Sequence, residues 1–177
     1  ICHEMMTCFA DLLSDRQVTF IPGDAEQLSF PSGQDLIVSC SALQWFVSPE
    51  LFFKRCNALL SGHGYFAFST FGKENLKEIA AVTGSGLHYY SLEELKKSLS
   101  MHYNIVTAGE ERIRLTFATP LDVLYHLKHT GVTAVCRQAW TKGDLQEFCD
   151  KYAKLFSCGN AVTLTYHPLY IIARKKP

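Results

Sequence analysis

Apolar residues recur along the first 71 residues at two spacings, one typical of amphipathic helices and one typical of buried strands. Spacings of three and four residues predict a helix over residues 3–13. Short runs rich in β-branched and aromatic residues predict strands over 18–21, 35–39 and 65–71. Between the last two strands, Ser48-Pro49 predicts the start of a helix that Gly62 ends. The connections are too long for hairpin turns, so this order indicates parallel strands joined by crossovers.

Helical spacing returns in the second half, now with recognisable caps. Helices are predicted near residues 76–82, 91–99, 120–131 and 141–156. Ser91 with Glu94 matches a capping box, Thr119-Pro120 begins a helix, and Thr141 or Asp144 caps the last one. Alternation over 112–117 predicts a half-exposed strand, with 103–107 as its partner. Residues 162–174 match a closing strand interrupted by Pro168, which places it at an edge or a bulge.

These patterns predict a single α/β domain over residues 1–177, with a mostly parallel sheet and an antiparallel end. The chain has 177 residues, of which 47% are hydrophobic and 19% charged, which excludes a disordered or low-complexity class. Its 17 basic and 17 acidic residues balance, which argues against a strongly basic nucleic-acid binder. No apolar run approaches the roughly 18 residues of a membrane span, so no membrane partner is expected.

The seven cysteines are odd in number and contain no Cys-x-x-Cys pair. This argues against a disulfide framework or a zinc ribbon, and it favours a reducing, cytoplasmic compartment in which the cysteines pack in the core. His126 and His129 lie three apart without a ligating context, so no metal site is predicted. Gly62-His63-Gly64 precedes a strand, whereas a phosphate loop follows one, so it indicates a turn.

The loops after the first two predicted strands carry more information, because parallel α/β sheets bind ligands at the carboxyl ends of strands. Gly23-Asp24-Ala25-Glu26, then 35–39, then Ala42-Leu43-Gln44-Trp45 closely resemble class I S-adenosylmethionine-dependent methyltransferases. The stretch 62–69 fits the strand after that family's "P-G-G" turn. Four later segments resemble the malonyl-acyl-carrier-protein O-methyltransferases of the biotin pathway. These are Asn75–Glu78, Gly84–Leu87, Leu127–Gly131 and Leu164–Tyr170.

The resemblance implies a Rossmann-like sheet of order 3-2-1-4-5-7-6 with an antiparallel strand 7. Residues 18–21, 35–39 and 65–71 would be strands 3, 4 and 5, and the last two strands would lie near 110–117 and 162–174. The family's glycine-rich loop after strand 1 and the acidic residue after strand 2 have no counterpart in this sequence. We therefore expect a chain whose N-terminal part is missing, with residues 72–102 forming a helical insertion or lid over the substrate site.

The resemblance also implies a site. Asp24 would accept a hydrogen bond from the adenine amino group, the Ala25 amide would contact adenine, and Glu26 would lie beside them. Cys40, Ser41 and Ala42 would line the cofactor, with Gln44 and Trp45 at the methyl end. Substrate contacts would come from Trp45, Lys128, Tyr166 and His167.

The implied reaction transfers a methyl group from S-adenosylmethionine to the free carboxylate of malonyl-acyl-carrier protein. That carboxylate is ionised at neutral pH and needs no general base, so no catalytic residue is named. A cation should hold it; the candidates are Arg112, Arg114, Arg137 and Lys128. A basic patch would steer the acidic carrier protein; its possible members are Lys73, Lys77, Lys96, Lys97 and Lys128.

Two alternatives remain open, and we expect a cytoplasmic monomer in each case. The first is a class I methyltransferase for another small molecule. The second is a non-catalytic fragment or binding module, and the missing glycine loop supports this alternative. A nucleic-acid methyltransferase is disfavoured, because Ser39-Cys40-Ser41-Ala42 stands where an Asn/Asp-Pro-Pro-Tyr type motif would be.

Overall fold

The computed structural model describes residues 17–132 and 140–177, so the predicted helix over 3–13 and Arg137 lie outside the described residues. Its strands are β1 (Gln34–Cys40), β2 (Leu60–Phe71), β3 (Tyr103–Glu110), β4 (Ile113–Phe117), β5 (Ser157–Cys158), β6 (Ala161–Tyr166) and β7 (Pro168–Lys175). Its helices are η1 (Leu43–Trp45), α3 (Pro49–Leu59), α4 (Lys77–Thr83), α5 (Leu92–Leu99), α6 (Pro120–His129) and α7 (Lys142–Phe156). Within these ranges, no helix combines the length and apolarity that crossing a membrane requires.

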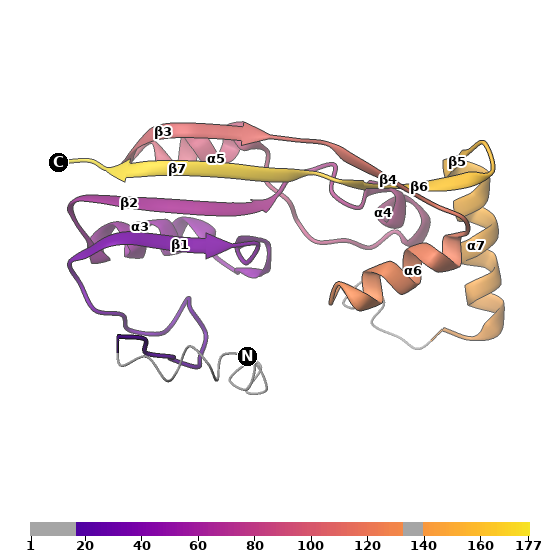
Figure 1. The fold of residues 1–177 in the computed structure, drawn as a ribbon, viewed down its shortest axis with the longest axis horizontal. Helices are drawn as coiled ribbons and strands as arrows, with labels where there is room; N and C mark the ends of the chain where they lie inside the picture. The colour runs from indigo at the N-terminus through magenta and orange to yellow at the C-terminus, as the bar shows by residue number, and fades with distance from the viewer. Residues whose placement is uncertain (1–16, 133–139) are drawn as a thin grey trace.

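The main sheet has the order β1-β2-β7-β3 (Figure 1). β1 and β2 are parallel, and β7 runs antiparallel to both of its neighbours, so β1, β2 and β3 all point the same way. The predicted α/β fold with an antiparallel last strand is therefore confirmed, and the order corresponds to the 4-5-7-6 part of the expected sheet. α3 and α5 pack on one face of this sheet, over a core that includes Phe53, Phe66 and Leu99.

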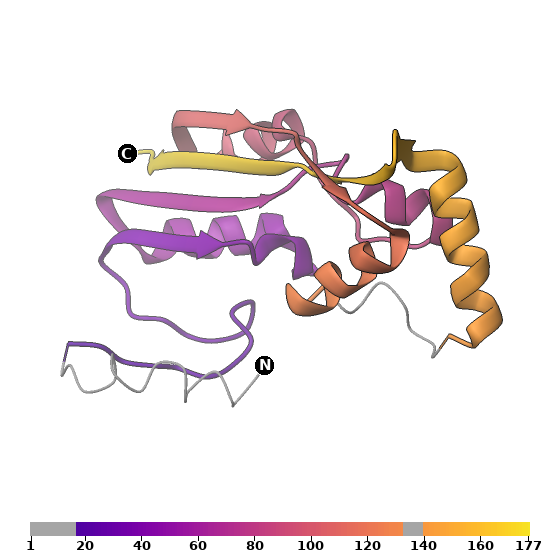
Figure 2. The ribbon, with the colours of Figure 1, turned by 45° about the vertical axis from the view of Figure 1, so that its right-hand side comes forward.

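A second, smaller sheet has the order β4-β6-β5 and packs with α4, α6 and α7. The two sheets are joined by a long antiparallel ribbon in which β3 and β4 run against β7 and β6 (Figure 1). In the turned view of Figure 2, α6 and α7 stand at the end toward which β1 and β2 point. The second sheet therefore lies beyond the carboxyl ends of these two strands.

The segment Gly72–Glu78 satisfies the edge of β6 that β5 leaves open. The Leu76 amide donates to the Thr165 carbonyl at 2.8 Å, and the buried Glu78 carboxylate accepts from the Thr165 amide at 3.0 Å and from its hydroxyl. The Asn75 side chain accepts from the His167 amide at 3.2 Å. Side chains and turn backbone thus replace a neighbouring strand here, which keeps this edge from remaining unpaired.

The helix starts that the sequence predicts at Ser91, Thr119 and Thr141 are confirmed. Ser91 with Glu94, Thr119 with Asp122, and Thr141 with Asp144 each form a complete capping box. The helix that begins after Ser48 ends earlier than predicted, because Leu60 already belongs to β2 rather than to the helix.

Three strand predictions were wrong. Residues 18–21 form no strand, since the described residues supply no neighbouring strand with which to pair them. The stretch 103–107 does not pair with 113–117, because β3 bonds to β7 and β4 bonds to β6. The expected strand over 162–174 is divided into two at His167, and β7 lies inside the main sheet rather than at its edge.

The position of Pro168 explains how β7 tolerates a proline. It is the first residue of β7, where a missing amide hydrogen interrupts no ladder. The cysteine prediction holds in part, since Cys56 is buried while Cys40 and Cys158 are exposed.

Candidate active site

The loop that follows β1 is fixed to β2 by a sharp turn at Ser41. This residue has φ of 49°, in the left-handed region that few non-glycine residues adopt. Its amide donates to the Ser69 carbonyl at 3.0 Å and to the Ser69 hydroxyl at 3.1 Å. Gln44 extends the connection, donating to the Ser41 carbonyl at 2.5 Å and accepting from the Thr70 hydroxyl at 3.2 Å. Ser41 and Gln44 are therefore held together at the carboxyl ends of β1 and β2.

Asp24 and Glu26 have different roles in the preceding loop. One Asp24 carboxylate oxygen accepts from the Glu26 amide at 2.9 Å, as in an Asx turn, and no described group bonds to the other oxygen. The Glu26 carboxylate accepts from the amides of Val47 and Ser48 at 2.9 and 2.8 Å. Both Glu26 oxygens thus tie the loop to the start of α3, where an acidic group also suits the helix dipole.

A cavity of about 480 Å³ lies along the open edge of β1, between this loop and α3. Three of the predicted cofactor residues, Ala25, Cys40 and Ala42, line it together with Phe46 and Phe52. Phe46 and Phe52 meet edge to face, with ring centroids 4.7 Å apart. An apolar cavity with aromatic walls fits a flat ring such as adenine, so the chain's own residues suit the adenine end of the expected cofactor.

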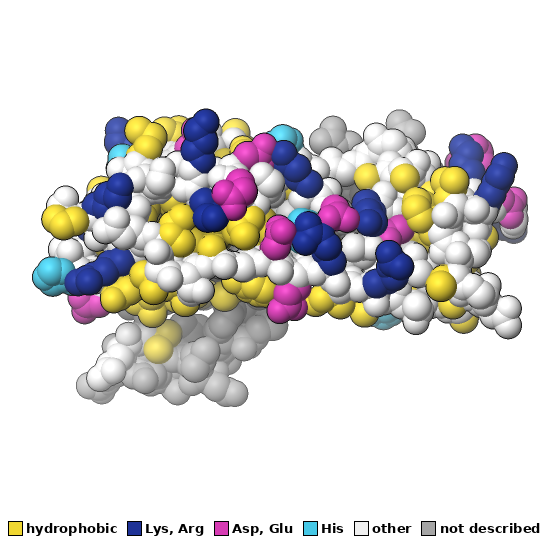
Figure 3. Space-filling view, turned by 90° about the horizontal axis from the view of Figure 1, so that it is seen from above, with side chains coloured by type: hydrophobic (Ala, Val, Ile, Leu, Met, Phe, Trp, Pro, Cys, Tyr) yellow, Lys and Arg dark blue, Asp and Glu magenta, His cyan; other side chains and the backbone are white. Residues whose placement is uncertain are grey.

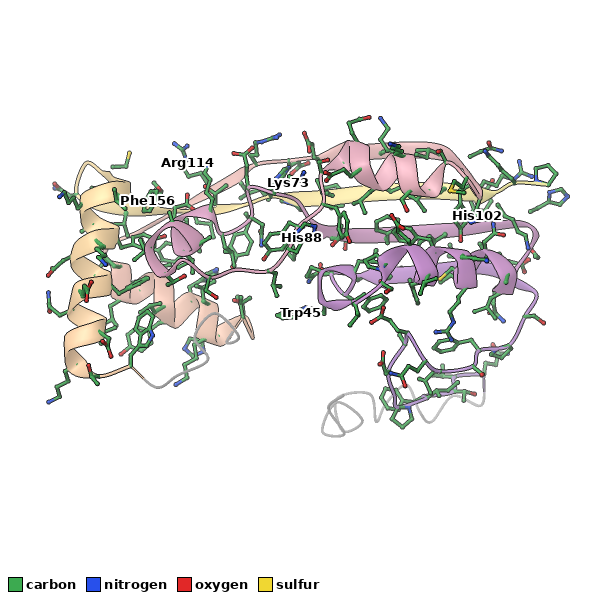
Figure 4. The ribbon with its side chains drawn as sticks, turned by 180° about the vertical axis from the view of Figure 1, so that it is seen from behind. Trp45, Lys73, His88, His102, Arg114 and Phe156 are labelled. Carbon is green, nitrogen blue, oxygen red and sulfur yellow. The ribbon has the colours of Figure 1, made fainter. Side chains whose placement is uncertain are left out.

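Trp45 ends η1 and is 49% exposed. Figure 4 shows it beside the carboxyl end of the main sheet, near His88 and on the side that faces α6. A large apolar ring that remains half-exposed at this place is available to a substrate, whereas the adjacent Leu43 is buried in the core.

Tyr166 lies between the two sheets at the end of β6. Its hydroxyl is 3.0 Å from Nε2 of His126, and its ring lies 6.2 Å from that of Phe71, the last residue of β2. Burial raises the pKa of the Tyr166 hydroxyl, which therefore stays protonated and able to donate near neutral pH.

His167, in contrast, is 3% exposed and belongs to the interior. Its Nδ1 accepts from the Glu74 amide at 3.1 Å, and its Nε2 is 3.1 Å from a Glu110 carboxylate oxygen. Since Nδ1 accepts from an amide, the proton sits on Nε2 and is donated to Glu110. His167 thus joins the two sheets and contacts no open cavity among those described.

The predicted carboxylate-binding cations differ in their availability. Arg112 is bonded to Glu74 at 2.6 Å and to Glu110 at 3.1 Å, so its charge is already balanced. Arg114 and Lys128 are exposed and have no carboxylate partner among the described side chains. Arg114 lies on β4, far from Trp45 in Figure 4, whereas Lys128 lies in the last turn of α6.

The proposed lysine patch is largely neutralised. Lys73, Lys77 and Lys96 pair with Glu94, Glu74 and Glu93 at 2.6, 2.9 and 2.8 Å. Figure 3, which views the molecule from above, shows basic and acidic side chains next to one another. The expectation of one basic patch was therefore wrong for these three lysines, while Lys97 and Lys128 remain without such partners in the described structure.

Sequence reasoning missed the structural roles of Glu78, Asn75 and Tyr89. Glu78 is only 2% exposed, and the Asn75 side chain donates to the Tyr89 hydroxyl at 3.1 Å. The only signal was that Asn75–Glu78 is a segment of the subfamily resemblance. In the described ranges, no group of three or more His, Cys, Asp or Glu side chains is arranged to hold a metal ion.

The chain is similar to known methyltransferases. A family model described as a methyltransferase domain matches residues 1–68. The malonyl-[acyl-carrier protein] O-methyltransferase of Bacteroides thetaiotaomicron is 55% identical over 99% of the chain, which spans 71% of that protein. The Bacteroides fragilis protein of the same name is 56% identical over 99% of the chain, which spans 36% of it.

Solved structures share the fold. Protein BH2331 of Bacillus halodurans C-125 matches with a TM-score of 0.69 and 16% identity, covering 100% of this chain and 81% of that one. At this identity the likeness supports the architecture and carries no information on the substrate.

Proposed function

The chain belongs to the malonyl-[acyl-carrier protein] O-methyltransferase family, and we propose that it transfers a methyl group from S-adenosylmethionine to the free carboxylate of malonyl-acyl-carrier protein, an early step of biotin synthesis. The 55% identity over nearly the whole chain carries this proposal. The cavity lined by Ala25, Cys40 and Ala42 supports it, because it lies where the cofactor of this fold was expected.

The proposed methyl transfer requires no general acid or general base from the protein. When bound, S-adenosylmethionine would supply a methyl group activated by its positively charged sulfur; the methyl carbon–sulfur bond would break as the new carbon–oxygen bond forms, and neutral S-adenosylhomocysteine would leave. The malonyl carboxylate is the nucleophile and is ionised at neutral pH, so one of its oxygens forms the new bond without losing a proton to a base. The protein's task is to align the two groups and exclude water. This requirement agrees with a site built from apolar walls and fixed loops.

The chain's own residues divide between the two ligands. Ala25, Cys40, Ala42 and Phe46 would surround the adenine end, with the free Asp24 carboxylate oxygen as acceptor for the adenine amino group. Ser41 and Gln44, fixed by Ser69 and Thr70, would shape the wall toward the methyl group.

On the acceptor side, Trp45 and the Tyr166 hydroxyl would contact the malonyl group. We assign Lys128 to its carboxylate, because Figure 1 shows the C-terminal end of α6 directed toward η1. His167 would position Tyr166, its neighbour in the chain, rather than touch substrate. In the expected insertion over residues 72–102, α4 and α5 pack in the two cores, so the lid over the substrate site would be the connecting residues 84–91.

The proposal includes an acidic carrier protein as partner, a cytoplasmic location and a monomer.

The test uses the full-length protein with malonyl-acyl-carrier protein and methyl-labelled S-adenosylmethionine. We expect label in a base-labile methyl ester on the malonyl group. Acetyl-acyl-carrier protein, which has no free carboxylate, is the matched control and should remain unlabelled. Equal labelling of other small carboxylic acids would favour a different small-molecule methyltransferase. Absence of any transfer, with cofactor binding intact, would favour a non-catalytic binding module.

A further inference from the structure

A groove between α3 and α5 has no part in the cofactor site. It encloses about 680 Å³, and its apolar residues include Leu51 and Met101, which are 63% and 76% exposed. Large apolar side chains exposed together beside charged ones are typical of protein-binding surfaces. The two helices themselves are well anchored, by Phe53 and Leu99 in the core of the main sheet.

The groove has an excess of positive charge. Lys54 and Lys97 line it, and neither has a carboxylate partner among the described residues. Of its two acidic residues, Glu94 is neutralised by Lys73 at 2.6 Å, which leaves Glu50. At the outer end, the Lys176 ammonium donates to the Ser100 carbonyl at 2.5 Å and adds a further positive charge.

One end of the groove reaches the active site. Figure 4 shows His88 and His102 at opposite ends of the space between α3 and α5, with His88 toward Trp45. His88 and Tyr90, in edge contact with centroids 4.9 Å apart, also line a small cavity together with Gln44 and Thr70. This pair of rings therefore lies between the groove and the loop of Gln44 and Trp45.

We infer that the α3–α5 groove is the docking surface for the acidic carrier protein, whose malonyl-bearing arm enters the active site past His88 and Tyr90. The inference rests on the proposed function, which requires a carrier-bound acceptor. An acidic helix fits a groove edged by Lys54, Lys97 and Lys176 with an apolar floor, because charges at the rim orient the partner and the apolar residues hold it. Because His88 and Tyr90 line both this groove and the small cavity beside Gln44, docking on this face would bring the malonyl group toward the carboxyl ends of the strands.

The test compares two acceptors in the full-length protein. One is malonyl-acyl-carrier protein; the other is the malonyl thioester of N-acetylcysteamine, which has the reacting group but no carrier. The variant is Lys54→Glu with Lys97→Glu. Its matched control is Lys142→Glu with Lys154→Glu, which reverses two exposed lysines on α7 at the far end of the molecule (Figure 1).

We expect the groove variant to raise KM for the carrier substrate about tenfold and to leave turnover of the small thioester unchanged, while the α7 control resembles the wild type. At about 1 M salt, where the Debye length is about 3 Å, the difference in KM for the carrier substrate between the wild type and the groove variant should become smaller. Normal use of the carrier by the groove variant, an equal effect of the α7 variant, or a parallel loss with the small thioester would each overturn the docking surface. Failure of the wild type on both acceptors would instead refute the proposed function.

Discussion

His167 Nε2 donates to a Glu110 carboxylate oxygen at 3.1 Å, and this bond joins the point where β6 passes into β7 to the end of β3. The same imidazole accepts from the Glu74 amide through Nδ1, so both ring nitrogens are satisfied in a nearly closed site. Gly72 lies so close that a Cβ there would stand 2.6 Å from the ring. One buried side chain therefore fixes the junction of the two sheets.

Replacing this ring should destabilise the fold. His167→Ala would leave the Glu74 amide without its acceptor and open a void beside Gly72. A buried donor without a partner costs about 1–3 kcal/mol, and we expect the free energy of unfolding to fall by about that amount. Urea unfolding followed by circular dichroism measures it. His129→Ala, on the exposed side of α6, should change stability by less than about 0.5 kcal/mol. Equal stability of the two variants would contradict the role assigned to His167.

Glu78 gives a second, independent prediction. Its carboxylate accepts from both the amide and the hydroxyl of Thr165, whereas a glutamine would place a donor against one of them. We expect Glu78→Gln to lower the free energy of unfolding by about 1–3 kcal/mol and to speed hydrogen exchange of the Thr165 amide. Glu93→Gln, on an exposed carboxylate, is the control. Unchanged exchange at Thr165 in Glu78→Gln would refute the edge-covering role.

The acid dependence of stability should involve Glu74. Hydrogen bonds from Arg112 and Lys77 lower the pKa of this carboxyl from 4.5 to about 2. His167 and Arg112 likewise lower the pKa of Glu110. Because these folded carboxylates release protons more readily than unfolded ones, the unfolded chain binds more protons at low pH. The stability they contribute is complete above pH 4.5 and is lost as the pH falls toward about 2.

Arg112→Gln removes the first cause of the Glu74 shift and should make this loss smaller. The measurement is the urea midpoint at pH 7 and again at about pH 3, between the two pKa values of Glu74. Arg114→Gln, also on the exposed ribbon, is the control and should keep the wild-type difference. If Arg112→Gln loses as much stability on acidification as the wild type, the pairing does not set the pKa of Glu74.

Much of the fold follows from local signals in the sequence. The three capping boxes depend on residues three apart, and the buried strands at 35–39 and 65–71 depend on continuous apolar runs. The division of the C-terminal strand at His167 has no such signal. It arises because Gly72 and Asn75, more than ninety residues earlier, bond to the His167 backbone and because β3 and β4 pair with different parts of the ribbon.

In the candidate site, too, long-range contacts could not be predicted from the sequence. The resemblance to the methyltransferase family implied Ala25, Cys40 and Ala42, and the structure brings these three to one cavity. The Glu26 link to Val47 and Ser48 spans 21 and 22 residues and depends on where α3 begins relative to the loop. Such a contact is decided by tertiary packing, so composition and spacing could not reveal it.

Asp24 and Glu26 should therefore respond differently to mutation. Asp24→Asn keeps an oxygen for the Glu26 amide but removes the charge that would hold adenine, so we expect affinity for S-adenosylhomocysteine to fall about tenfold with stability unchanged. Glu26→Gln weakens the link to α3 and should mainly lower thermal stability. Calorimetric titration and melting of the full-length protein distinguish the two effects. Identical behaviour of both variants would show that the loop acts as one unit.

The last prediction concerns the cationic residue that binds the malonyl carboxylate. Lys128 is exposed, unpaired among the described side chains, and lies in the last turn of the helix that points toward η1, whereas Arg114 lies on β4 away from that region. Loss of one charge-assisted contact costs about 1.5–3 kcal/mol, so Lys128→Met should lower kcat/KM for malonyl-acyl-carrier protein by at least tenfold while KM for S-adenosylmethionine stays constant. Arg114→Met should behave like the wild type. The reverse pattern would move the carboxylate site to β4.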